Sequence, residues 1–261
     1  MSNLPQFETL VCKKEQSILL VELNRPEKLN AFNDQIFRDI SRITEIASSE
    51  PEVRVVVFKG RGRAFSSGAD LAELSGGITE IDSGTLEQRI RAAQEVMDQV
   101  EAVPQPTIAA INGPAVGAGF QLALACDFRI AAKGIKMGLS DVKIGIIPAL
   151  GATTRLPKLI GLAKSKELIM GGNLIISEDA YQMGLINQLV EAEALDESVY
   201  NLANNLSRSA PLALSTAKSL LNSEVSLDRV AAAQVQLLKS EDANEGIAAF
   251  LEKRKPAFKG S

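Results

Sequence analysis

NGPAVGAGFQLALACD, residues 112–127, is the stretch that most constrains the fold of this chain. Small residues cluster there between an apolar run typical of a strand and an apolar run typical of a helix. Gly117, Ala118 and Gly119 carry almost no side chain, so a ligand carbonyl can approach the peptide N–H groups at the helix start. The helix dipole favours negative charge at the same place. The stretch therefore predicts one half of an oxyanion hole.

A candidate for the second half lies upstream in residues 60–71, GRGRAFSSGADL. This glycine-punctuated turn follows a strand-like run and ends where a helix is expected to start. Taken singly, either turn is explained as a tight chain reversal, and Asp70 is most simply a helix cap. The two turns together favour a site between them.

Composition limits the classes of function. The chain has 261 residues, a net charge of −4 and 46% hydrophobic residues, as expected for one large domain or one domain with a helical appendage. A negative net charge does not favour nucleic acid or an anionic membrane as a partner. The N-terminal residues do not resemble a signal peptide, and no run approaches the ~20 apolar residues of a membrane span, so a cytoplasmic location is expected. Cys12 and Cys126 are expected to be reduced core residues, and no metal-ligand spacing is present.

The chain contains no histidine, which constrains the mechanism. Its absence excludes Ser-His-Asp and Cys-His arrangements and most zinc sites. The two tyrosines, Tyr181 and Tyr200, fall in helical patterns. Carboxylates are therefore the leading candidates for acid-base chemistry.

Hydrophobic periodicity predicts an α/β protein with a helical C-terminal part. We expect strands at 17–23, 53–59, 107–111 and 127–131, and helices at 31–49 and 86–100, with a polar stretch at 75–84. After a turn-rich segment at 133–151, helices are expected at 152–160, 162–170, 178–183, 195–208, 211–222 and 226–253. We divide the chain into a core, residues 1–200, and a C-terminal helical region, residues 201–261.

Four ordered motifs resemble those of the crotonase superfamily of enoyl-CoA hydratases and isomerases. They are NRPEKLNAF at 24–32, GRAFSSGADL at 62–71, the stretch at 112–127 and MGLSDVKIGIIPALGATTRL at 137–156. The ending EGIAAFLEKRKPAFKG at 245–260 is also similar to that family. The resemblance implies a spiral of ββα units with a C-terminal trimerisation region, assembled as a homotrimer or a dimer of trimers. It implies an acyl-CoA thioester as substrate, with coenzyme A as part of that substrate and no separate cofactor.

The resemblance also assigns roles to residues. By motif position, the backbone N–H groups of Ala69 and Ala118 hold the thioester oxygen as an enolate develops. Gln121 and Asp141 occupy the positions of the two glutamates of classical hydratases. Glutamine cannot take a proton, and the loss of a positioned base costs about 10² to 10⁴ in rate. Aspartate is one methylene shorter than glutamate, and a misplacement of about 1 Å can cost on the order of 10². Fast hydration by the two-glutamate route is therefore not expected.

Two reactions remain compatible with one carboxylate and an oxyanion hole. Asp141 can move a double bond between the 3,4 and 2,3 positions by removing an α proton and returning it at γ. The other is hydration of a substrate more reactive than a simple enoyl chain, with Gln121 orienting water and Asp141 delivering the proton. A dienoyl isomerisation is not favoured, because the family pattern for that reaction has a further carboxylate where this chain has Ala149. The alternative for Asp141 is a helix or turn cap in the polar loop LSDVK.

The family's coenzyme A contacts map onto both ends of the chain. The resemblance implies that Arg25, Ala31, Ala64, Asp70 and Leu71 lie along the coenzyme, whereas Lys253 and Phe258 reach its phosphate and adenine from the same or a neighbouring subunit. A solvated, basic helix end explains the last two equally well. Arg155 is expected to form a structural ion pair. The favoured function is an acyl-CoA enzyme; a catalytically weak acyl-CoA-binding or scaffold protein on the same fold is the alternative.

Overall fold

The computed structural model of the protein describes residues 4–75 and 81–261, and its centre is a six-stranded sheet. The strands lie in the order β1-β2-β3-β4-β6-β9. They span Leu10–Glu15, Ile18–Leu23, Val55–Gly60, Thr107–Ile111, Phe128–Ala132 and Gln188–Val190. β1 pairs antiparallel with β2, and the later neighbours pair parallel. Parallel strands end at the same edge of a sheet, so the loops after β2, β3 and β4 leave it together.

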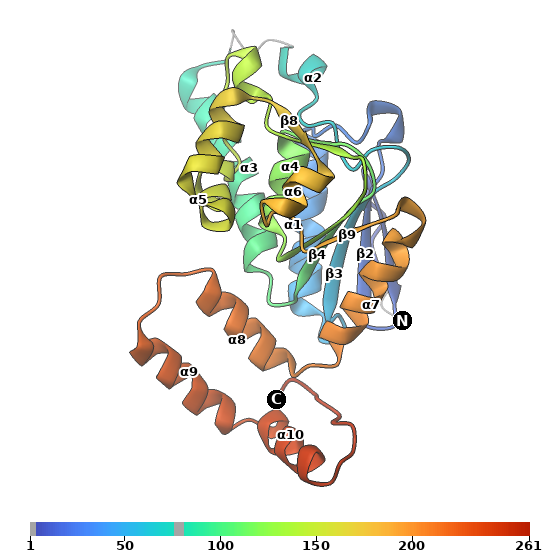
Figure 1. Cartoon of the computed structure of the whole chain (residues 1–261), viewed down its shortest axis with the longest axis vertical. Coiled ribbons are helices and arrows are strands. Elements are labelled where there is room, and N and C mark those ends of the chain that lie inside the picture. Colours follow the sequence, from blue (N-terminus) through green and yellow to red (C-terminus); the bar gives the residue numbers. More distant parts are fainter. Residues whose placement is uncertain (1–3, 76–80) are drawn as a thin grey trace.

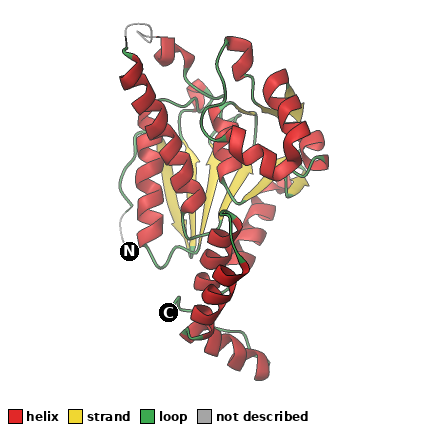
Figure 2. Cartoon of the chain, turned by 90° about the vertical axis from the view of Figure 1, so that its left-hand side faces the viewer, coloured by secondary structure: helices red, strands yellow, loops and turns green. Residues whose placement is uncertain are grey.

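Helices cover both faces of this sheet because its strands are apolar on both sides. α1 (Asp34–Ser49), α3 (Ser83–Ala102), α4 (Ala118–Ala125) and α5 (Ala152–Gly171) form one hydrophobic core with the residues on one face. α7 (Leu195–Ser207) packs on the other face, where Val55 and Val57 point. Figure 2 shows the sheet between these helices.

A second, three-stranded sheet consists of very short strands. β5 (Ala115–Val116) pairs parallel with β7 (Lys136–Gly138), which pairs antiparallel with β8 (Leu174–Ile176). Two isolated parallel bridges, Phe32 to Ala69 and Ser66 to Ala115, join the loops after β2, β3 and β4. These short pairings hold together the segments that carry the four sequence motifs.

The remaining elements are short helices and a C-terminal arm. The short helices are η1 (Pro26–Lys28), α2 (Leu71–Ser75), η3 (Asp141–Ile144), α6 (Ser177–Gln182) and η4 (Ala192–Ala194). We call α8 (Pro211–Leu221), α9 (Leu227–Leu238) and α10 (Glu241–Leu251) the C-terminal arm. In Figures 1 and 2 the arm extends from the end of the core opposite to α2.

The predicted α/β core with a helical C-terminal part is confirmed, with local corrections. The single helix predicted at 226–253 is wrong, because Ser240 accepts a hydrogen bond from the Ala243 N–H at 3.1 Å and starts a separate helix. The separate helices predicted at 152–160 and 162–170 are confirmed, because Gly161, with a φ of +75° and a ψ of 163°, is non-helical and divides α5 into two helical segments. Within the polar stretch predicted at 75–84, residues 76–80 lie outside the described residues. The boundary at residue 200 stays a prediction and falls inside α7.

Candidate active site

The two glycine turns of the sequence motifs lie in direct contact. A Cβ atom on Gly68 would lie 3.0 Å from the Val116 carbonyl oxygen, and Gly68 has a φ of +99°. A Cβ atom on Gly119 would lie 2.3 Å from the Ser66 Cβ. Real Cβ atoms do not approach so closely, so glycine is required at 119 for the first turn to pack on the start of α4.

The backbone donors that the hydrogen bonds around these turns leave unused include those of Ala69 and Ala118. Phe32 N–H donates to the Gly68 carbonyl at 2.7 Å, and Asp70 N–H donates to the Phe32 carbonyl at 2.8 Å. In an extended segment successive N–H groups alternate in direction, so the Ala69 N–H points away from Phe32. The Ala118 N–H belongs to the first residue of α4, which has no intrahelical acceptor. Neither N–H has a protein acceptor in the described part of the chain. This arrangement suits an oxyanion hole, and the role itself stays a prediction.

The Asp141 carboxylate lies beside the second turn. Its two oxygens are 3.8 and 3.9 Å from the position that a Cβ on Gly117 would occupy. The Oδ2 atom is buried and has no hydrogen-bond partner among the described residues. Burial raises the pKa of Asp141, and a hydrogen bond from its own backbone offsets this only in part. A carboxyl group with one unpaired oxygen and a raised pKa is suited to acid-base chemistry.

The capping alternative for Asp141 gains no support from this geometry. Ser140 occupies the position before η3, and no side chain there makes a capping hydrogen bond.

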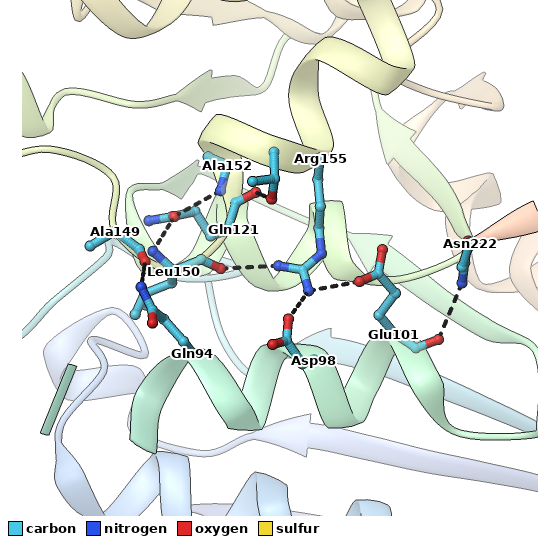
Figure 3. A network of polar contacts seen from close by, with 11 residues as sticks. Gln94, Asp98, Glu101, Gln121, Ala149, Leu150, Ala152, Arg155 and Asn222 are labelled. Atoms are coloured by element: carbon cyan, nitrogen blue, oxygen red, sulfur yellow. Dashed lines mark hydrogen bonds and ion pairs between the residues drawn. The ribbon is translucent and has the colours of Figure 1, made fainter. Parts of the chain in front are cut away.

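Gln121 lies one turn after Ala118 on α4 and is only 2% exposed. Its Oε1 accepts hydrogen bonds from the Leu150 N–H at 2.8 Å and the Ala152 N–H at 3.3 Å (Figure 3). Two backbone donors can face only the oxygen of the amide, so its orientation is settled. The Nε2 atom has no protein acceptor in the described part of the chain and, unlike the Asp141 Oδ2, is not sealed from solvent. Gln121 can therefore only donate to a bound molecule.

Arg155, in the first turns of α5, is 5% exposed and forms the expected structural ion pairs. Its Nη2 contacts the Asp98 carboxylate at 2.5 Å and the Glu101 carboxylate at 2.8 Å. Its Nη1 donates to the Leu150 carbonyl at 3.1 Å. The ion pair was predictable from the sequence, whereas the contact with the loop that holds Gln121 was not.

Arg25 and Asp70 tie the first two motifs together. The guanidinium donates to the Ala31 carbonyl at 2.6 Å, to Asp70 at 3.0 Å and to Glu73 at 3.3 Å. Burial disfavours the ionised form of Asp70, but the Arg25 hydrogen bond, a backbone hydrogen bond from Glu73 and the Arg25 charge lower its pKa. The backbone contact agrees with the predicted capping role of Asp70 at α2. Both charged groups are thus engaged within the protein.

Asn30 is a structural residue of this site that the sequence patterns did not single out. It is fully buried with a φ of +55°, and its amide donates to the carbonyls of Arg61 at 3.0 Å and Ala64 at 2.9 Å. Its Oδ1 accepts from the Arg25 N–H at 2.9 Å. The available signal was an asparagine in a loop, a residue type that tolerates a left-handed backbone.

The predicted coenzyme A contacts fall into two separate groups. Ala31 and Ala64 are buried next to the first turn, and Leu71 is exposed at the start of α2. Lys253 and Phe258 lie beyond α10, and a Cβ on Gly246 would lie 3.3 Å from the Phe258 ring. Figure 1 places this end of the chain opposite to α2. Within one chain the two groups do not converge, and their binding roles stay predictions.

The described residues carry neither of two features that mark other classes of protein. In residues 4–75 and 81–261, no three or more Cys, Asp or Glu side chains are grouped as a metal site would need. None of the helices described is both long enough and apolar enough to cross a membrane.

Comparisons with known proteins agree on one kind of relative. Residues 13–261 match the enoyl-CoA hydratase/isomerase family. The chain is 38% identical over 253 residues to an enoyl-CoA isomerase/hydratase of Mycosarcoma maydis, covering 91% of each chain. It is 35% identical to the 2,3-dehydroadipyl-CoA hydratase of Escherichia coli, covering 96% of this chain and 98% of that one. The crystal structure of an enoyl-CoA hydratase from Bacillus anthracis superposes with a TM-score of 0.91 at 34% identity, covering 97% and 100% of the two chains.

Proposed function

The chain belongs to the enoyl-CoA hydratase/isomerase family, and from that premise we propose that it stabilises a thioester enolate with Asp141 as its one acid-base group. Its fold is the expected crotonase-like α/β fold, and enoyl-CoA hydratase or isomerase activity is what its relatives support. The observation that carries the proposal is the buried, unpartnered Asp141 Oδ2 beside the bare Gly117 turn.

The first step of the proposed reaction uses the backbone. The thioester oxygen accepts hydrogen bonds from the Ala69 and Ala118 N–H groups, which stabilise the negative charge that develops when the α proton leaves. Removing one such donor typically costs about 10² to 10³ in rate. The Asp141 carboxylate takes the α proton, and the electron pair of the broken C–H bond moves into the enolate.

Isomerisation and hydration form the enolate in different ways. Isomerisation removes the α proton, whereas hydration adds water to the β carbon with loss of one water proton and then protonates the α carbon. In isomerisation, protonated Asp141 returns its proton to the γ carbon and the double bond moves from the 3,4 to the 2,3 position. Hydration requires a group that accepts hydrogen bonds from water, yet the Gln121 Oε1 already accepts two backbone N–H groups. That commitment favours isomerisation, with Gln121 Nε2 as a donor that orients the acyl group.

The assembly proposed is a homotrimer or a dimer of trimers. Large apolar side chains on the C-terminal arm, Leu221, Leu227, Phe250 and Leu251, are more than 70% exposed in the single chain, which supports burial against another copy. In such an assembly Lys253 and Phe258 would contact the coenzyme A of a neighbouring subunit. Coenzyme A enters as part of the substrate, no separate cofactor is proposed, and the free Cys12 and Cys126 support a cytoplasmic location.

The experiment incubates the protein with crotonyl-CoA and, separately, with a 3-enoyl-CoA in deuterated water. Isomerisation predicts deuterium exchange at the α and γ carbons of the 3-enoyl-CoA, with slower addition of water to crotonyl-CoA. Hydration without exchange would exclude the isomerase assignment. A protein that binds both thioesters but transforms neither, with Asp141→Asn behaving like the wild type, would instead be the scaffold alternative.

A further inference from the structure

The loop at residues 149–152, just before and at the start of α5, is held by side chains from three helices (Figure 3). The Gln94 Nε2 on α3 donates to the Ala149 carbonyl at 2.7 Å. Arg155 on α5 donates to the Leu150 carbonyl. Gln121 on α4 accepts from the N–H groups of residues 150 and 152. We call this loop the clamped turn.

Residues on one face of α3 hold the clamped turn in place. Gln94, Asp98 and Glu101 are spaced four and three residues apart, so they lie on the same side of that helix. Gln94 contacts the clamped turn directly, whereas Asp98 and Glu101 hold the Arg155 guanidinium that contacts it. The position of the turn is therefore set by α3 as well as by its own helix.

Gly151 shows how closely Arg155 packs against the clamped turn. A Cβ atom there would lie 1.9 Å from the Arg155 Nη1, and the residue has a φ of +104°. The guanidinium thus lies directly against the backbone of the turn, and a side chain at 151 would displace it. The Arg155 guanidinium therefore packs against the backbone of the turn and also donates to its Leu150 carbonyl.

We propose that Gln94 and Arg155 are positioning residues of the active site. They hold the clamped turn by its carbonyl groups, and the turn fixes the Gln121 amide through two N–H groups so that Nε2 alone faces the bound acyl group. The inference rests on the proposed function, because it assumes that Gln121 Nε2 contacts substrate. It adds that the reactive geometry depends on two side chains with no substrate contact of their own.

Gln94→Met tests the inference because it removes the donor to Ala149 with little change in side-chain length. The matched control is Gln105→Met, since Gln105 Nε2 donates to the Ala47 carbonyl at the same 2.7 Å and is also half-buried. A displacement of Gln121 by about 1 Å would lower kcat on the order of 10- to 100-fold. We expect KM to change less than about threefold, because the oxyanion donors stay in place. The control should change kcat less than about twofold.

A double-mutant cycle separates positioning from general destabilisation. If Gln94 acts through Gln121, Gln94→Met should lower kcat little further in a Gln121→Met background. Hydrogen exchange of the Leu150 and Ala152 amides should accelerate in Gln94→Met and not in Gln105→Met. This measurement requires no substrate. Equal kcat values for the Gln94 and Gln105 variants, or additive losses in the cycle, would overturn the inference. A wild-type protein that transforms neither enoyl-CoA would instead refute the proposed function, with the exchange pattern still testing the clamp.

Discussion

The turn that carries Asp141 and the clamped turn that holds Gln121 belong to the same sequence motif but are organised in opposite ways. In η3 a carboxyl oxygen is buried without a partner, and burial raises the pKa of that carboxyl. In the clamped turn the polar groups of residues 149, 150 and 152 are paired with Gln94, Gln121 and Arg155. A buried polar group without a partner lowers the stability of the protein but stays free to react. A buried polar group with hydrogen-bond partners stabilises the protein and holds its neighbours in a fixed geometry. The difference separates the residue expected to react from the residues that align it.

Asp141→Asn should have the largest effect on activity. The amide cannot take a proton, so kcat should fall by about 10² to 10⁴ for the 3-enoyl-CoA. Steady-state kinetics measure this, with the exposed Asp34→Asn as control. In the wild type, kcat/KM should decline as the pH falls through a pKa above 3.8, the ordinary value for Asp. An unchanged rate in Asp141→Asn would exclude this residue from the chemistry.

The same substitution should raise stability at neutral pH. Because the pKa of Asp141 is raised in the folded protein, the folded state favours the protonated form, and ionisation above that pKa destabilises it. The variant should therefore have a higher Tm than the wild type at pH 7, and the difference should disappear below about pH 3.8. Thermal melts across this pH range check the sign.

Gln121→Met should lower both activity and stability, in contrast to Asp141→Asn. The N–H groups of Leu150 and Ala152 lose their acceptor, and each buried unpaired donor costs about 1 to 3 kcal/mol. We expect kcat to fall about 10- to 100-fold as the acyl group loses its orienting donor. Urea unfolding and kinetics on the same preparation measure both. A variant as stable as the wild type would contradict the observed pairing.

Gln121→Glu should give the clamped turn a carboxylate, as the turn with Asp141 already has. The carboxylate would accept the same two N–H groups at the N-terminus of α5, where the dipole favours negative charge, so it should ionise without loss of stability. A second carboxylate restores the arrangement for water addition, and hydration of crotonyl-CoA should rise about tenfold or more. If hydration does not rise while the fold is kept, a missing base at 121 is not what limits that reaction.

Asp98→Asn should have the smallest effect. Asp98 is 70% exposed, and Glu101 continues to hold Arg155. Exposed ion pairs contribute about 0 to 1 kcal/mol, so kcat should change less than about threefold. A loss of kcat as large as that of Gln121→Met would show that the ion pair between Asp98 and Arg155 matters as much for activity as Gln121 does.

The elements with strong periodicity were predictable from the sequence, and the shortest ones were not. β2, β3, β4 and β6 follow apolar, β-branched runs, and each lies within two residues of its predicted position. β5, β7, β8 and β9 have two or three residues each, too few for any period, and exist because distant partners pair with them. The separate α10 was missed because the apolar pattern continues across Ser240.

The candidate site divides in the same way. The local glycine patterns predicted two turns with a site between them, whereas the roles of Ala69, Ala118, Asp141 and Gln121 follow from motif position in a resemblance. Gln94 and Asn30 were not predictable, because their role is defined by carbonyl groups 55 and 34 positions away in the chain. No local pattern marks a glutamine on a helix surface as the support of a remote loop.

The contact between Gly119 and Ser66 has a consequence for how such sequences can change over time. With only 2.3 Å between a Cβ at 119 and the Ser66 Cβ, the two positions share the volume of a single side chain. A relative that carries alanine at 119 is then expected to carry glycine at 66 or a shifted first turn. The two turns of the proposed oxyanion hole should therefore change together, which would be visible as covariation between positions 66 and 119 when homologous chains are aligned.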